Sequence, residues 1–548
     1  MAPYKALFEP LEIRGKEVRN RLSSSGHVPG YTPEGVPNER YIAYNREKGK
    51  GGIGLITFGG STNIARESTT IFGGLNVRSN DDMPPYRRLA QAVHGEGARI
   101  MCQIPHMGRH CRTDFAEMLP VAGPSQLREP GGARALPRTM DEEDIAAAIE
   151  DYVTGARRLA EAGLDGVEII SSMHLPGQFL SPLANQRSDR WGGTLENRLR
   201  FLRLVLYACR AALPSDFWVG VRYTADETNE GGIAPEEGIE VGRLLGAHGV
   251  ADFLNVNGAY SGTQQGVNAS FPGMEAKSAP HIALAREVRR VSGLVTMQAS
   301  RLDTLSAAHW AVESGAMDLA GMTRPHIADP HIVAKLMRGE EHRIRPCVGA
   351  GYCLDRPYRG LDALCLHNPS TSRETTLPHD IEKAPTPQRA IVVGGGPTGD
   401  VLVYDEVGGH AALSIAQLLA EGGARVTFAT MDPIPGRDLG AQHKPVYMRA
   451  LRQRGARIAP DTRLLAITPS GNRLAATLED RWSWERVETD FDAVVVDLGV
   501  VPDPSLFEAL SPEPANRGRL DLHALADGRA QPVVPGLDAP SSIASGTR

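Results

Sequence analysis

The sequence contains little cysteine, with six cysteines in 548 residues. So few cysteines in so long a chain exclude the dense disulfide framework that is typical of small secreted proteins. Three of them, Cys347, Cys353 and Cys365, nevertheless fall within one short stretch. Because cysteines gathered at short spacing are typical of metal ligands, this stretch is a candidate metal site.

Long apolar runs and a strong excess of charge of one sign are also absent. No apolar run approaches the roughly 18 residues that a membrane-spanning helix needs. The first ten residues, M-A-P-Y-K-A-L-F-E-P, show no apolar core of a secretory signal. The formal net charge of -6 does not indicate a nucleic-acid partner. The sequence therefore predicts a cytoplasmic protein without nucleic-acid or membrane partners.

The first 344 residues alternate short apolar or β-branched runs with amphipathic helical patterns. Eight such β-then-α units match a (β/α)8 TIM barrel better than the alternative, a doubly wound open sheet. We expect helices over 141–162, 195–212, 235–248 and 280–291. The predicted strands lie near residues 20–26, 53–58, 98–104, 165–171, 217–223, 252–257, 294–299 and 317–322.

Polar side chains collect at the carboxyl ends of these predicted strands, where a barrel of this kind carries its chemistry. Amide, imidazole and guanidinium groups there suit a flavin, which needs amide partners for its pyrimidine edge and cations for its phosphate. The candidate flavin-binding residues are Ser25, His27, Gly59, Gln103, Arg222, Ser300, Arg301, Thr323 and Arg324.

Three further residues near the same rim are candidates for contact with a substrate. His174 follows the fourth strand and is suited to act as a base or to orient an amine or carboxylate; the simpler interpretation is a hydrogen-bonded loop histidine. Glu227 follows the fifth strand, where a carboxylate suits a cationic substrate, although a solvated loop explains it as well. Tyr260 lies just past the sixth strand.

The cysteine stretch reads R-P-C-V-G-A-G-Y-C and, eleven residues later, C-L-H-N. Thiolates at such spacing bind an iron–sulfur cluster or zinc, unless the cysteines are simply buried. Only three thiolates are present where four are usual, because Ala350 stands three residues after Cys347.

A linker composition over 377–388 precedes a glycine-rich fingerprint, Gly394, Gly396 and Gly399, after the strand pattern 390–393. Such glycines let a pyrophosphate approach a helix N-terminus. Here a second strand pattern, D-V-L-V-Y-D, follows at once, and the expected helix is missing. A strand–turn–helix pattern then runs over 401–428. We expect a shortened Rossmann-like domain that binds FAD or ADP, or a degenerate domain that binds nothing.

Several of these stretches resemble the old yellow enzyme superfamily. They are Q-I-P-H-M-G-R, M-T-R-P-H-I-A-D-P and the long signature from Gln178 to Phe201. With the cysteine stretch and the glycine-rich unit, the chain is similar to the multidomain branch that includes trimethylamine dehydrogenase and 2,4-dienoyl-CoA reductase, and most similar to N-methylproline (stachydrine-type) demethylases.

The resemblance implies four segments and a chain of cofactors. An FMN-binding barrel would span 1–344, a cluster segment 345–376, a linker 377–388 and a nucleotide-binding domain 389–548. FMN would bind Gln103 and Arg222 through its ring and Arg301 and Arg324 through its phosphate. Cys347, Cys353 and Cys365 would hold an iron–sulfur cluster, 4Fe-4S or, because of Ala350, 3Fe-4S.

Three departures from the family pattern bear on the reaction. Ile169 and Ser172 stand where ene-reductases of the family carry a pair that grips a carbonyl, and His174 stands where they carry a tyrosine proton donor. Gly60 stands where trimethylamine dehydrogenase has a tyrosine of its aromatic bowl. The third departure is Ala350.

The resemblance with these departures predicts an FMN enzyme that demethylates an N-methyl amine or amino acid. Electrons would leave through the cluster to an acceptor similar to electron-transfer flavoprotein, and we expect a homo-oligomer. Two alternatives stay open: an NAD(P)H-dependent enoate or dienoyl-CoA reductase, and a flavin-binding electron-transfer subunit.

Overall fold

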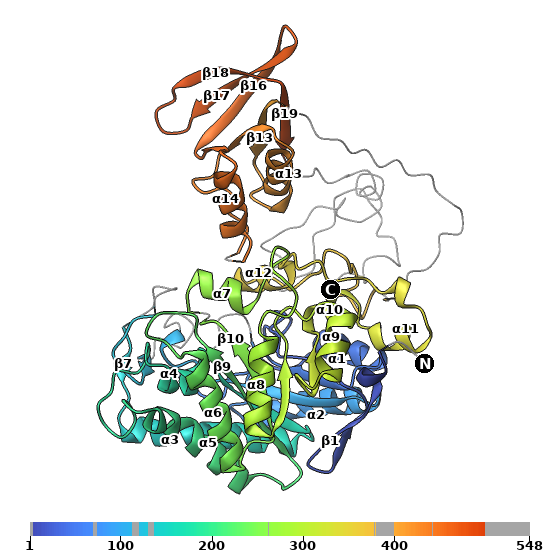
Figure 1. The fold of residues 1–548 in the computed structure, drawn as a ribbon, viewed down its shortest axis with the longest axis vertical. Helices are drawn as coiled ribbons and strands as arrows, with labels where there is room; N and C mark the ends of the chain where they lie inside the picture. Colours follow the sequence, from blue (N-terminus) through green and yellow to red (C-terminus); the bar gives the residue numbers. More distant parts are fainter. Residues whose placement is uncertain are drawn as a thin grey trace, which may run out of the picture. The chain divides into compact units, whose positions relative to one another are not determined.

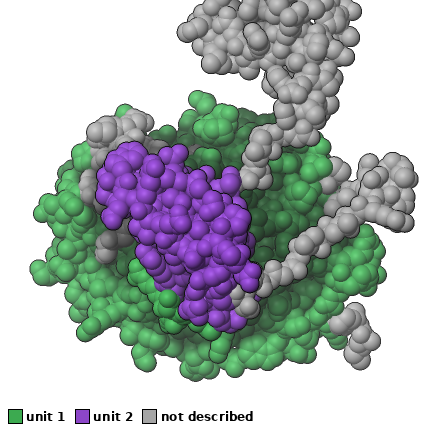
Figure 2. Space-filling view, turned by 90° about the horizontal axis from the view of Figure 1, so that it is seen from above, with its two compact units in different colours: residues 1–396, 438–455 green, residues 397–437, 456–548 purple. Residues whose placement is uncertain are grey.

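The computed structural model describes residues 4–68, 74–111, 120–129, 136–260, 262–377, 379, 399–440 and 442–498. They belong to two compact units, coloured separately in Figure 2. The first unit is 1–396 with 438–455, and the second is 397–437 with 456–548. In the described part of the chain no helix is both long and apolar enough to cross a membrane.

The first unit is built around a closed barrel of eight strands (Figure 1), which confirms the predicted fold. All neighbouring strands are parallel. Each strand overlaps one of the eight predicted ranges. They are β3 (Leu22–Ser24), β4 (Leu55–Phe58), β5 (Arg99–Ile104), β8 (Gly166–Ser171), β9 (Trp218–Asp226), β10 (Phe253–Gly258), β11 (Val295–Gln298) and β12 (Leu319–Gly321).

Helices alternate with these strands along the chain. They are α1 (Glu39–Lys50), α2 (Met83–His94), α3 (Glu142–Glu161), α4 (Leu175–Leu180), α5 (Leu195–Ala212), α6 (Pro235–His248), α7 (Gln264–Ser270), α8 (Ile282–Ser292), α9 (Leu305–Glu313), α10 (Thr323–Ala328), α11 (Ile332–Met337) and α12 (Tyr352–Tyr358). Short elements are η1 (Lys5–Phe8), η2 (Asn80–Asp82), η3 (Gly108–His110), η4 (Glu341–Arg343) and the two-residue strands β6 (Ala122–Gly123) and β7 (Arg138–Thr139).

The predicted helix boundaries agree closely with these elements. α5 and α6 have the predicted bounds, and α3 begins after Asp141, whose carboxylate accepts hydrogen bonds from the N–H groups of Glu143 and Asp144. α8 begins two residues later than predicted. Ala279 is held in the left-handed region, at φ +48°, and its N–H donates to the carbonyl of Arg301, so the helix starts only after His281.

A hairpin of β1 (Leu11–Ile13) and β2 (Lys16–Val18) packs against the apolar residues at the amino ends of the strands. Ile13 and Val18 lie in one buried cluster with Trp218 and Phe253. The Trp218 indole N–H donates to the Ile13 carbonyl at 2.7 Å, which satisfies a polar group that would otherwise be buried without a partner.

Three aspartates repeat one arrangement at the amino ends of alternate strands. Asp165, Asp252 and Asp318 each stand directly before a strand and accept the N–H of a residue in the preceding strand along the chain. The acceptor distances are 2.9, 2.7 and 3.0 Å. Each also pairs with an arginine. These carboxylates therefore tie β5 to β8, β9 to β10 and β11 to β12.

The second unit contains a parallel sheet in the order β15-β14-β13-β19, with α13 (His410–Glu421) after its first strand. The strand and helix predicted over 401–428 are confirmed. The parallel strands are β13 (Asp400–Asp405), β14 (Arg425–Thr430), β15 (Arg457–Ala459) and β19 (Ala493–Asp497), and an antiparallel sheet consists of β16 (Thr462–Ser470), β17 (Arg473–Asp480) and β18 (Arg486–Phe491).

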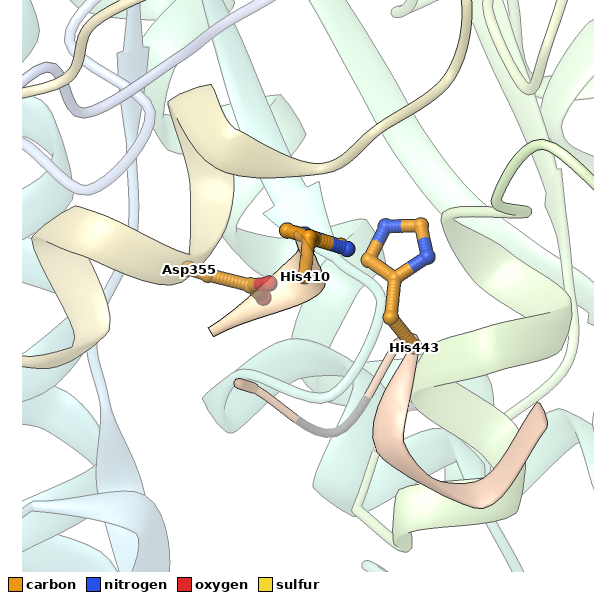
Figure 3. Close-up of side chains that lie close together, drawn as sticks. All are labelled: Asp355, His410 and His443. Carbon is orange, nitrogen blue, oxygen red and sulfur yellow. The ribbon is translucent and has the colours of Figure 1, made fainter. Parts of the chain in front are cut away.

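The segment 438–455, which includes α14 (Lys444–Gln453), belongs to the first unit although its sequence interrupts the second. The Gln442 amide donates to the Phe271 carbonyl at 2.8 Å, and Arg359 forms an ion pair with Asp438 at 3.2 Å. Asp355 and His443 of this unit are drawn in Figure 3; His410, also labelled there, belongs to the second unit.

We expect Asp165→Ala to reduce the free energy of unfolding of the barrel by about 2–4 kcal/mol, because the Ile100 N–H and Arg99 then lose a buried partner. Chemical denaturation followed by far-UV circular dichroism measures the change. The matched control is Glu240→Ala, which removes an exposed pair with Arg243 and should cost far less. Equal stability of Asp165→Ala and wild type would contradict this assignment.

Candidate functional site

One cavity of the first unit brings together seven of the nine predicted flavin-binding residues. Its volume, counted together with the space open to solvent, is about 570 Å³. It lies at the carboxyl ends of strands β3, β9, β11 and β12 and the loops that follow. The predicted residues that line it are Ser25, His27, Arg222, Ser300, Arg301, Thr323 and Arg324.

One end of this cavity, at the loops after β11 and β12, carries two guanidinium groups that differ in their hydrogen-bond partners. Arg301 is held by the carbonyls of Gly273 and Met274 and by Asp303 at 3.3 Å. Arg324, by contrast, has a buried Nη1 without a hydrogen-bond partner in the described part of the chain. A buried donor without a partner is costly, and an anion would relieve it. The residues therefore fit the phosphate of FMN.

Strand β3 and helix α10 are joined at the same end of the cavity. The Ser25 N–H donates to the Thr323 hydroxyl oxygen at 2.8 Å, and the two hydroxyl groups also lie 2.8 Å apart. The Ser300 hydroxyl donates to the Ser270 carbonyl at 2.9 Å. These bonds fix the loop after β3 to helix α10, and the loop after β11 to helix α7.

The remaining two predicted flavin-binding residues, Gly59 and Gln103, lie at the ends of β4 and β5. Gln103 closely approaches Gly26, because a Cβ on Gly26 would lie 2.4 Å from the Gln103 Oε1 atom. Gly59 has φ +95° and only 2.1 Å between a hypothetical Cβ and the Thr62 hydroxyl. Glycine is therefore required at Gly59 for both its backbone conformation and its packing.

Glu168 organises the polar groups within the barrel, and sequence reasoning did not find it. Its side chain on β8 is fully buried. It accepts hydrogen bonds from the amides of Gln103 and, at 2.9 Å, Asn255. Burial raises the pKa of Glu168, while the Arg222 guanidinium opposes that rise. A carboxylate in the apolar strand G-V-E-I-I-S was the signal available in the sequence.

His174 and Tyr260 belong to one buried polar group above this network. The Tyr260 hydroxyl donates to Glu129 at 2.6 Å and accepts from Arg109 at 2.5 Å, and Arg109 forms an ion pair with Glu129 at 2.7 Å. His110 lies 3.5 Å from Glu129, and its ring centroid is 6.4 Å from that of His174. Glu129 and His110 carried no recognisable pattern in the sequence.

The His174 imidazole is electrically neutral at ordinary pH. It stands immediately before helix α4, is buried, and its Nδ1 has no hydrogen-bond partner in the described part of the chain. Burial lowers the pKa of His174 to about 3, and the neighbouring His110 and Arg222 act in the same direction. His174 therefore offers an uncharged imidazole to a bound molecule.

Glu227 has structural partners for one of its carboxylate oxygens. Its Oε2 accepts from the Ser181 hydroxyl and from the Ile233 N–H, each at 2.9 Å. Its backbone carbonyl accepts the Tyr260 N–H at 3.1 Å. Glu227 thus fixes the position of Tyr260 and of the loop after β9.

The three clustered cysteines line a second cavity of about 350 Å³. Burial raises the pKa of the Cys353 thiol to about 12, and Cys347 and Cys365 raise it further, so the three thiols influence one another. Ala350 lies on the same wall, as do His367 and Tyr352. Among the described residues these thiols do not form a group with all ligand atoms within 4.8 Å, the close spacing expected around a single metal ion such as zinc. Three cysteines around one cavity are donors of the kind that hold iron–sulfur clusters.

The two cavities of the first unit have a common wall. Arg324 lines both of them. Helix α12 contributes Cys353 to one cavity and Leu354 to the other, and the His27 Nε2 atom lies 3.0 Å from the Cys353 carbonyl oxygen. Arg324 and the adjacent residues Cys353 and Leu354 thus stand between the two cavities.

Comparison with known proteins agrees with this geometry. Residues 6–343 match the model of the NADH:flavin oxidoreductase / NADH oxidase family, and residues 356–524 match Pyridine nucleotide-disulphide oxidoreductase. The chain belongs to the NADH:flavin oxidoreductase / NADH oxidase family. Its membership confirms the resemblance to old yellow enzymes and makes the protein an FMN-dependent oxidoreductase; the second match supports a fold of the FAD- or NAD-binding type.

Two relatives in this family are similar over nearly the whole chain. A probable N-methylproline demethylase of Rhizobium meliloti is 32% identical over 97% of this chain and 95% of its own. An N,N-dimethylglycine/sarcosine dehydrogenase of Chromohalobacter salexigens is 32% identical over 98% of this chain and 95% of its own. The structure of a 2-naphthoyl-CoA reductase has a TM-score of 0.78 at 20% identity, over 95% of this chain and 98% of the other, and shows the fold alone.

The alignment with the demethylase is longer than this chain. Its 643 positions exceed the 548 residues of this chain by 95, so at least that many positions lie opposite gaps in this chain. Gly394 and Gly396 of the predicted fingerprint lie outside the described residues. Gly399 directly precedes β13, at the amino end of the parallel strands, whereas nucleotides bind parallel sheets at the carboxyl end.

We expect the barrel to lose stability as the pH falls from about 6.5 towards 4. His174 has a lowered pKa of about 3 when folded, so below pH 6.5 the unfolded chain takes up a proton that the folded chain does not. The loss reaches at most about 1.4 kcal/mol per pH unit for each such histidine. Denaturant unfolding at several pH values should show a shallower slope for His174→Gln than for wild type.

The exposed His342 provides the control for this measurement, because His342→Gln should leave the slope unchanged. Identical slopes for wild type and His174→Gln would mean that His174 is not buried as a neutral group.

Proposed function

We propose that this protein oxidatively demethylates an N-methylated amine, in particular an N-methyl amino acid. The observation that carries the proposal is that His174 is neutral and that the two residues with which ene-reductases of the family hold a substrate carbonyl are absent. Ile169 is a buried apolar residue of β8, and the Ser172 hydroxyl is engaged with Thr224 at 2.6 Å. The names of the two relatives, a demethylase and a dehydrogenase of N-methyl amino acids, support the same reaction.

The charges around His174 favour a substrate amine in its uncharged form. Arg222 lies nearby, and the same burial that disfavours a protonated imidazole disfavours an ammonium group. A free amine has the lone pair that assists removal of hydride from its methyl carbon, whereas an ammonium group does not. The pocket thus selects the reactive protonation state.

The residues of the pocket orient this amine. In the proposal, the neutral His174 imidazole donates its Nδ1–H to the carboxylate of the substrate, and Tyr260 forms a wall that Arg109, Glu129 and Glu227 hold in place. Bound FMN supplies the two-electron acceptor for the hydride of the N-methyl carbon. Water then converts the iminium to formaldehyde and the demethylated amine.

Electrons leave, in this proposal, through an iron–sulfur cluster held by Cys347, Cys353 and Cys365 to a protein acceptor similar to electron-transfer flavoprotein. The common wall of the two cavities supports this route, because electron transfer needs redox groups at short separation. His367 and Tyr352, on the cavity wall with Ala350, are the candidates for a fourth ligand.

The reaction is tested by mixing the oxidised holoenzyme anaerobically with N-methylproline, dimethylglycine or sarcosine and following flavin absorbance. We expect bleaching whose rate increases with pH as the substrate amine loses its proton, and release of formaldehyde. His174→Gln should slow bleaching at least tenfold, whereas Ser314→Ala, at the residue that directly follows α9, should not. A reductase would be favoured instead if no N-methyl substrate bleaches the flavin, while NADH bleaches it rapidly and an enoate added afterwards restores its absorbance.

The cluster is tested by iron and acid-labile sulfide analysis. Replacing Cys365 with serine should remove most of the iron and the broad absorbance near 400 nm, because only two thiolates remain. Cys209→Ala, which changes a buried cysteine of α5, should leave the iron content unchanged.

Ala350→Cys completes the set of four thiolates and should yield a cluster with four irons. If wild type and Cys365→Ser contain equal iron, or if wild type contains none, the cysteine cavity does not hold this cluster.

A further inference from the structure

The second unit contains a strand–turn–helix–strand arrangement of the kind that holds dinucleotides. β13, α13 and β14 form a parallel βαβ unit in which Asp400 pairs with Arg425 and Asp405 with Thr430. In dinucleotide-binding sheets the turn after the first strand presents N–H groups to the pyrophosphate at the carboxyl end of the strands. In this chain the turn after β13 has side chains that do not suit a pyrophosphate.

Glycines are missing where a pyrophosphate needs them. The six residues after the apolar part of β13 are D-E-V-G-G-H, whereas the earlier fingerprint reads G-G-G-P-T-G. Asp405, Val407 and His410 therefore stand at the three positions that glycine occupies in a G-x-G-x-x-G turn. Their side chains oppose the close approach of a pyrophosphate to the backbone.

A carboxylate already occupies the N–H groups of this turn. Asp405 is fully buried, and its Oδ1 accepts the N–H groups of Val407 and Gly408, each at 2.9 Å. Its Oδ2 has no hydrogen-bond partner in the described part of the chain. The donors that would bind a phosphate are thus used internally, by a group of the same charge as phosphate.

Further carboxylates stand around the same turn. Asp432 follows β14, and its Oδ2 lies 3.2 Å from the position that a Cβ would take on Gly408. The other oxygen of Asp432 accepts from Arg437 at 2.8 Å. Asp497 on β19 is the register partner of Asp405. Burial raises the pKa of Asp405, and Asp497 and Asp432 raise it further, as expected for neighbouring negative charges.

We infer that the βαβ unit of β13, α13 and β14 is closed to the pyrophosphate of NADH, FAD or ADP. Three carboxylates at the carboxyl edge repel a phosphate, and the turn has no N–H at Val407 or Gly408 left to bind one. A nicotinamide coenzyme therefore cannot deliver hydride from this turn. The inference does not depend on the substrate proposed above, and it concerns only this turn and not the glycines at 394–399.

Photolabelling of the full-length holoenzyme with 2-azido-NAD, followed by peptide mass spectrometry, tests the inference at the level of the turn. We expect no saturable labelling that NADH prevents within residues 400–432, whether or not peptides elsewhere are labelled. Saturable, NADH-sensitive labelling of residues 400–432 would overturn the inference.

The role of the carboxylates is tested with the double variant Asp405→Gly/Asp432→Asn, which frees the N–H groups of Val407 and Gly408 and removes both charges. This variant should label within 400–432 at least tenfold more efficiently than wild type. The control is Glu406→Gln, an exposed neighbour that accepts from the Tyr404 hydroxyl and should change nothing. A double variant with wild-type circular dichroism and flavin absorbance but no gain in labelling would also overturn the inference.

Discussion

Closure of eight parallel strands into one ring is the constraint on which the site depends. Because all the strands run in the same direction, their carboxyl ends meet at one rim, and side chains from residue 25 to residue 324 are brought together. The ring needs anchors at its other end, where Asp165, Asp252 and Asp318 tie strands in pairs. Stability is thus concentrated at the amino ends, and the carboxyl ends are left free for chemistry.

The buried carboxylates of the first unit divide the rim into two parts with different tasks. Glu168 holds Gln103 and Asn255 beside Arg222, where a flavin ring would need fixed amides. Glu129 holds Arg109 and Tyr260 farther out, around His174. Each carboxylate has an arginine near it, so its buried charge is offset locally, and burial keeps the His174 imidazole neutral.

Local sequence patterns predicted much of this architecture. Strands of the barrel are buried on both sides, so they read as apolar runs, and α5 and α6 have clear caps and periodicity. The contact between Arg109 and Glu129 could not be predicted, because it joins two loops with no regular pattern. The membership of 438–455 in the first unit was equally hidden, because it depends on distant partners such as Phe271.

The departures from family patterns in both units follow one physical rule. A site can keep its fold while one group changes in charge or size, and that change alters which ligand the site can hold. At Ala350 a methyl group replaces a thiolate, yet the cavity and the other three thiols remain. At Asp405 a carboxylate replaces a glycine, yet the strand, turn and helix remain, because the carboxylate satisfies the same N–H groups that a phosphate would. Folding needs those donors to be satisfied but does not specify by what, so retention of a βαβ fold is weak evidence for a bound nucleotide.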